Sequence, residues 1–126
     1  MRALLAVAAA VLLGGCATPS NRADNPDNFK QMAAGNVGAA NAQPMVDCVD
    51  DGFTRILGGG TNIAVKQTRR TALTRVEMVV GAYLVLSADI ADTGATQLLE
   101  NKAAAGIRTS KEIAEYKACL ERFAAK

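Results

Sequence analysis

Two segments of the chain carry apolar side chains at the spacing of an α-helix. Residues 44–56 start with Pro44, which suits a first helical turn, and one helical face collects the apolar positions Met45, Cys48, Val49, Gly52, Phe53 and Ile56. Residues 109–123 start with Thr109 and Glu112 at capping-box spacing, and their apolar face holds Ile113, Tyr116, Cys119, Leu120 and Phe123. The pattern predicts two amphipathic helices, the first ended by the three glycines at 58–60.

Between these segments the pattern changes to a period of two, which is typical of β-strands. One side of residues 75–80 holds Val76, Met78 and Val80, and one side of residues 83–90 holds Leu84, Leu86, Ala88 and Ile90. A hairpin turn is predicted at Asp92-Thr93-Gly94, before further alternation over residues 96–101. A strand within residues 62–71 could precede them. The sequence therefore predicts an α+β fold, a β-meander of three to four antiparallel strands packed on an N-terminal and a C-terminal helix.

An all-α helical bundle is the alternative, with one long helix over residues 66–90. Gly81 would then lie in the middle of that helix, at a cost of about 1 kcal/mol. The apolar positions would also surround this helix instead of forming a stripe. Both points favour strands.

The first residues have the order of a secretory signal: Arg2, an unbroken apolar run over residues 3–13, and then small residues. Leu13, Gly14, Gly15 and Cys16 resemble the lipobox of bacterial lipoproteins. The resemblance implies cleavage before Cys16, acyl chains such as palmitate on this cysteine, and a membrane anchor. Because Ala17 follows, it also implies the periplasmic face of the outer membrane. Residues 1–15 are thus interpreted as a signal peptide.

Residues 16–43 are predicted to be a lipidated N-terminus followed by a flexible tether. They are rich in asparagine, glutamine, alanine and glycine, with few large apolar side chains. A helix over residues 29–35, packed on the domain, is the alternative. Residues 44–126 then form one small domain.

The two remaining cysteines, Cys48 and Cys119, are predicted to form a disulfide. Both lie on the inward faces of the predicted helices, and an exported chain reaches an oxidising compartment. The crosslink would join the helices across 71 residues, since 119 minus 48 is 71. Their spacing is not that of a redox-active C-x-x-C motif.

Candidate polar sites are few. Four cations, Lys66, Arg69, Arg70 and Arg75, could contact a polyanion or could protect an edge strand against aggregation. Asp89, Asp92 and Gly94 lack the ligand alternation of a calcium loop and are interpreted as turn residues. Tyr83 and Tyr116 are interpreted as residues of the core or its margin. The sequence contains no histidine, and no metal site or cofactor is predicted.

The overall charge implies neither nucleic acid nor anionic lipid as a partner. Without Arg2, 13 basic residues face 12 acidic ones, and there is no tryptophan. The sequence thus predicts a lipid-anchored cell-envelope protein that is no enzyme and binds or scaffolds other envelope components, without a small-molecule substrate. A tethered periplasmic inhibitor or protective factor is the alternative, marked by a protruding loop or an apolar patch on the sheet. An enzyme would need a deep cleft with convergent polar groups.

Overall fold

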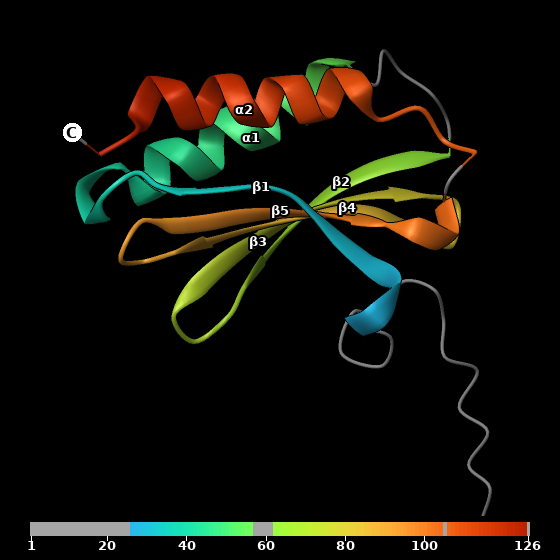
Figure 1. Cartoon of the computed structure of the whole chain (residues 1–126), viewed down its shortest axis with the longest axis horizontal. Coiled ribbons are helices and arrows are strands. Elements are labelled where there is room, and N and C mark those ends of the chain that lie inside the picture. The colour runs from blue at the N-terminus through green and yellow to red at the C-terminus, as the bar shows by residue number, and fades with distance from the viewer. Residues whose placement is uncertain (1–25, 57–61, 105, 126) are drawn as a thin grey trace, which may run out of the picture.

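The structure, a computed structural model, describes residues 26–56, 62–104 and 106–125. It contains a five-stranded antiparallel sheet of order β1-β5-β4-β3-β2 with two helices on one face (Figure 1). The elements in chain order are η1 Pro26–Asn28, β1 Phe29–Asn36, η2 Ala39–Asn41, α1 Ala42–Ile56, β2 Ile63–Arg69, β3 Leu73–Val80, β4 Tyr83–Ala91, β5 Ala95–Asn101, η3 Lys102–Ala104 and α2 Ser110–Phe123. The predicted α+β class is confirmed, with five strands instead of three to four, and the all-α alternative is wrong.

The additional strand lies where a flexible tether was predicted. β1 pairs antiparallel with β5, from Phe29 opposite Asn101 to Asn36 opposite Ala95. The tether prediction is therefore wrong for residues 26–43, and so is its helical alternative over residues 29–35. Alanine, glycine and asparagine are poor strand formers, so β1 forms because it pairs with a strand about 65 residues further along the chain. Residues 16–25 lie outside the described residues, as do the glycines at 58–60.

The helices run antiparallel on the same face of the sheet, α1 over β2, β3 and β4 and α2 closer to β1 (Figure 1). Cys48 of α1 and Cys119 of α2 form the predicted disulfide, with Cα atoms 6.0 Å apart. Tyr116 and Phe53 are the largest fully buried side chains of the core, whose other buried members are aliphatic residues, methionines and Cys119. The helix predictions are confirmed, and α1 begins two residues before Pro44.

A β-bulge changes which side chains of β4 enter the core. Met78 lies opposite Leu86 but Val79 lies opposite Leu84, so Val85 is an extra residue on β4. Val85 and Leu86 both belong to the core cluster, whereas Leu84, although buried, does not. The prediction that Leu84 shares a side with Leu86, Ala88 and Ile90 is therefore wrong for Leu84. Strict alternation cannot anticipate an inserted residue.

The N-terminus of α2 also differs from its prediction. Thr109 precedes the helix, but its hydroxyl makes no hydrogen bond to the helix backbone. Instead the Thr109 hydroxyl donates to the Glu100 carboxylate at the end of β5. The capping-box prediction is wrong because a strand that is distant in sequence supplies a stronger, charged acceptor.

The buried pair of Tyr116 and Thr96 connects α2 to β5. Their hydroxyl oxygens lie 2.7 Å apart and share a hydrogen bond. Burial raises the pKa of Tyr116 to about 12, although the bond to Thr96 acts in the opposite direction. The predicted core position of Tyr116 is confirmed. Tyr83, the first residue of β4, is in contrast 48% exposed, so its core interpretation is wrong.

Alkaline conditions should therefore destabilise the domain through Tyr116. Its pKa is higher in the folded chain than the value of about 10 in an unfolded one, so the contribution is fully present below pH 10. It is lost as the pH rises from 10 through 12, and about 2 kcal/mol should be gone at pH 11.5. Urea unfolding at pH 8 and pH 11.5 measures the change.

Tyr116→Phe is the control, since it keeps the ring and removes the ionisable group. Other groups titrate equally in both proteins. If Tyr116→Phe loses as much stability as the wild type between these two pH values, the buried phenol is not the cause.

Candidate binding surfaces

The structure does not bring the four predicted cations to one surface. Arg69 makes a two-point ion pair with Asp92 in the β4–β5 turn, Nη1 to Oδ1 at 2.6 Å and Nη2 to Oδ2 at 2.5 Å. These hydrogen bonds hold the pKa of Asp92 below its ordinary value and raise that of Arg69. Strand alternation puts Arg69 on the side of the helices and puts Lys66 and Arg75 on the opposite side. Two of the four cations thus bind carboxylates of the domain itself: Arg69 binds Asp92, and Arg75 binds Asp89.

The second pair, Arg75 with Asp89, lies on the sheet face that is turned away from α1 and α2, here called the outer face. Arg75 Nε lies 2.7 Å from Asp89 Oδ1, and Gln97 Nε2 approaches Asp89 Oδ2 at 3.4 Å. The three residues are cross-strand neighbours on β3, β4 and β5. Asp89 is only 7% exposed, so the Arg75 guanidinium and the Gln97 amide compensate its charge in place of water.

A hollow of about 300 Å³ lies beside this network on the outer face, towards the β4–β5 turn. Small and apolar side chains form most of its wall, and Asp89 and Gln97 contribute polar side chains. Its lining consists of Ala34, Gly35, Leu73, Asp89, Ala91, Ala95, Thr96 and Gln97. A volume of this size suits a single side chain or a small group of a partner better than an extended ligand.

Sequence reasoning missed the hollow for two reasons. Ala34 and Gly35 come from β1, the strand that was interpreted as a tether. Asp89 was interpreted as a turn residue, whereas it lies within β4. A signal for the site was present, because an acidic residue at an outward position of a mostly apolar strand needs a partner.

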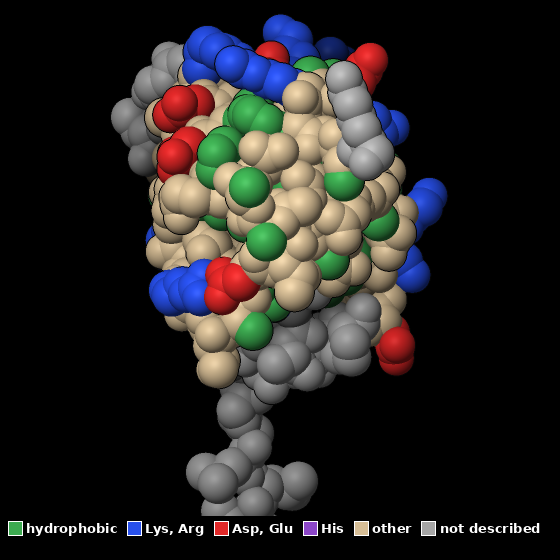
Figure 2. All heavy atoms as spheres, turned by 90° about the vertical axis from the view of Figure 1, so that its left-hand side faces the viewer, with side chains coloured by type: hydrophobic (Ala, Val, Ile, Leu, Met, Phe, Trp, Pro, Cys, Tyr) green, Lys and Arg blue, Asp and Glu red, His purple; other side chains and the backbone are tan. Residues whose placement is uncertain are grey.

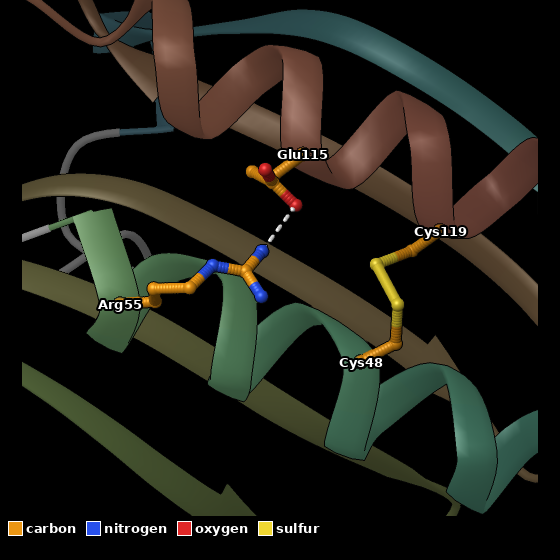
Figure 3. The surroundings of a disulfide bond; sticks show 4 residues. All are labelled: Cys48, Arg55, Glu115 and Cys119. Carbon is orange, nitrogen blue, oxygen red and sulfur yellow. Dashed lines mark hydrogen bonds and ion pairs between the residues drawn. A yellow bond between two sulfur atoms is a disulfide. The ribbon is translucent and has the colours of Figure 1, made fainter.

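A second depression, of about 390 Å³, separates the two helices on their solvent side. The Cys48–Cys119 disulfide lies in its wall, and Figure 3 shows Arg55 reaching from α1 to Glu115 of α2 beside it. The Arg55 Nη2 to Glu115 Oε2 distance is 3.0 Å. Because Asp51 and Arg122 also line the groove, its charges balance, and no class of charged ligand is favoured.

Charged side chains are unevenly distributed at the end of the molecule where the β4–β5 turn lies. Figure 2 shows this end with Lys, Arg, Asp and Glu side chains around its margin and mostly uncharged atoms in the middle. Isolated hydrophobic side chains are scattered there without forming a broad patch. Because charges of both signs are present, this end favours neither an anionic nor a cationic ligand.

Metal and membrane features can be stated for the described residues only. Among them, no group of three or more His, Cys, Asp or Glu side chains is placed to hold a metal ion. Asp89 and Asp92, the two carboxylates considered for calcium, are each bound by an arginine. No helix in the described part of the chain is long and apolar enough to cross a bilayer. Cys16 lies outside these residues.

Comparisons with known proteins do not extend these observations. No protein-family model matches the chain, and neither a curated protein nor a solved structure matches it.

Proposed function

We propose that this protein is a lipid-anchored component of the bacterial cell envelope that binds another envelope component and catalyses no reaction. The distribution of the three cysteines carries the proposal. Cys48 and Cys119 pair within the fold, as expected for a chain that folds in an oxidising compartment. That leaves Cys16, which follows the apolar run and small residues that resemble a lipobox, as the cysteine available for acylation.

The distance from anchor to domain is shorter than the sequence suggested. The described structure begins at Pro26, so residues 17–25, nine residues, separate the proposed acylated position from the first described turn. In any conformation, the chain from Cys16 to Pro26 reaches at most about 35 Å. The domain is therefore proposed to stay close to the membrane surface, on the periplasmic side of the outer membrane.

The hollow on the outer face is the proposed contact site for the partner. Its wall is mostly apolar, with the side chains of Asp89 and Gln97 as the polar groups that would orient what enters. The helices cover the other face of the sheet, which leaves the outer face for recognition. No specific observation favours the inhibitor alternative. An apolar patch on the sheet was its expected mark, whereas Tyr83 is the one large hydrophobic residue that is exposed among the described residues.

Cys16→Ser tests the anchor. The wild-type protein should incorporate radiolabelled palmitate and fractionate with outer membranes. The variant should lose the label completely and remain as a precursor or a soluble periplasmic form. Cys48→Ala with Cys119→Ala is the matched control, since it removes two cysteines and should retain the label. Unchanged labelling of Cys16→Ser would refute the anchoring proposal.

The same cells test the contact site when a photoreactive residue replaces Ala34 at the rim of the hollow. Irradiation should give a discrete protein adduct, and Ala91→Arg, which fills the hollow, should remove it. Ala114, an exposed alanine on α2, is the matched control position and should give none. Equal adducts from Ala34 and Ala114 would count against a specific site on the outer face.

A further inference from the structure

One end of the domain collects the start of β1, the turn between β3 and β4 and the end of β5. The strand register establishes this, since Phe29 lies opposite Asn101 and Val80 lies opposite Tyr83. η3 and the start of α2 follow directly after β5, and this end is on the right of Figure 1. It is called the entry end here, because the chain enters the fold there.

Tyr83 projects from the entry end. It is 48% exposed, and no other large hydrophobic side chain in the described ranges is counted as exposed. It is the first residue of β4 and follows the short turn of Gly81 and Ala82, which are also exposed. A tyrosine in this position presents an apolar ring with a polar tip, the combination that is enriched where proteins meet the headgroup region of a bilayer.

Four exposed cations lie at the same end of the domain as Tyr83. The exposed basic residues are Lys30, Lys102, Arg108 and Lys111, and the exposed acidic residue among the described ones there is Asp27. Of the other two acids at this end, Glu100 is half-buried and accepts a hydrogen bond from Thr109, and Glu112 is 5% exposed. Counting all seven groups gives four positive and three negative charges, but the exposed ones are four to one. The accessible surface is therefore basic.

Among the described residues, the opposite end has neither an exposed large hydrophobic side chain nor an excess of exposed cations. There Arg69 is paired with Asp92, and the remaining exposed charges, Arg70, Arg122, Asp47 and Glu121, are balanced. Figure 2, which faces this end, shows positive and negative groups together around an uncharged centre. An anionic surface would thus attract the entry end and not the other one.

We propose that the entry end docks on a membrane surface of anionic phospholipid. Tyr83 inserts into the headgroup region, while Lys30, Lys102, Arg108 and Lys111 lie over the phosphates. This inference rests on the proposed lipid anchor, which would bring the same end to the bilayer because only nine residues lie between Cys16 and Pro26. Docking turns the hollow, which lies towards the β4–β5 turn, away from the membrane and leaves it accessible to a partner.

A single-tryptophan reporter tests the orientation, because the chain contains no tryptophan. The full-length lipoprotein with Tyr83→Trp is reconstituted in phosphatidylcholine vesicles with and without phosphatidylglycerol, both with brominated acyl chains that quench tryptophan emission. Strong quenching and a blue-shifted emission are expected with phosphatidylglycerol. Ala82→Trp provides a second reporter in the adjoining turn, and Thr93→Trp, in the exposed β4–β5 turn, should remain unquenched.

Charge is tested in the Tyr83→Trp protein. Reversal of two cations with Arg108→Glu and Lys111→Glu should lower the ratio of docked to undocked molecules at least about tenfold, and 1 M salt should act in the same direction. Arg70→Glu, a reversal at the opposite end, should leave the ratio unchanged.

Three results would overturn the proposal. Quenching of Tyr83→Trp and Ala82→Trp that does not exceed that of Thr93→Trp refutes docking by this end, and equal quenching with and without phosphatidylglycerol refutes recognition of anionic lipid. In both cases an intact mass that includes the acyl chains shows that the anchor itself stands. A mass without acyl chains refutes the proposed function and this inference with it.

Discussion

Replacing Cys48 and Cys119 together by alanine should lower the free energy of unfolding by about 4 kcal/mol. The disulfide joins positions 71 residues apart, so it encloses β2, β3, β4 and β5 in one loop and restricts the unfolded chain. A domain of this size is stable by about 5 to 15 kcal/mol in total, and the variant should unfold at a much lower urea concentration.

Reduced wild-type protein is the control for this experiment. It keeps both sulfur atoms in place and lacks only the covalent bond, so its urea midpoint should agree with that of the double variant. A double variant within 1 kcal/mol of the oxidised wild type would show that packing, and not the crosslink, holds α1 against α2.

Gly94→Ala should destabilise the fold by a similar amount, about 4 kcal/mol. Gly94 has φ +93°, and a Cβ atom at this position would lie 2.4 Å from backbone atoms of Gly38. Relief of that contact must displace the connection between β1 and α1, which Gly94 holds by accepting a hydrogen bond from Val37 N–H at 2.9 Å. Urea unfolding of the variant measures the loss.

Gly81→Ala separates backbone conformation from the close approach. Gly81 also has a positive φ, +60°, but a Cβ atom there would meet nothing within 4 Å. This variant should cost only about 1 kcal/mol, the penalty of the left-handed backbone alone. If the two variants lose equal stability, the contact between Gly94 and Gly38 contributes nothing.

The local patterns that proved informative were those repeated over many residues. The helical stripes of α1 and α2 and the alternation of β3, β4 and β5 each extend over seven or more positions, so one irregular residue does not conceal them. Cys48 and Cys119 lie on the predicted inward faces, and their disulfide is present. The turn at Asp92-Thr93-Gly94 is found where the glycine indicated it, with Gly94 N–H donating to the Ala91 carbonyl oxygen.

The features that sequence reasoning missed depend on residues far apart in the chain. β1 has no strand-forming pattern of its own and is held by pairing with β5. Thr109 bonds to Glu100 instead of to its own helix. The predicted cation cluster is divided because Arg69 and Arg75, six positions apart, lie on opposite faces of the sheet and find different aspartates.

The sequence by itself determined the α+β class, the two amphipathic helices, the meander and the pairing of the cysteines, because periodicity and residue type act over neighbouring positions. It also supplies the lipobox-like residues before Cys16 on which the proposed anchor depends. Only the tertiary structure decided that residues 29–36 form a fifth strand, that Asp89 lies beside a hollow, and that Tyr83 is exposed at the same end as four exposed cations. Each of these depends on which distant segments become neighbours, and no local pattern encodes that.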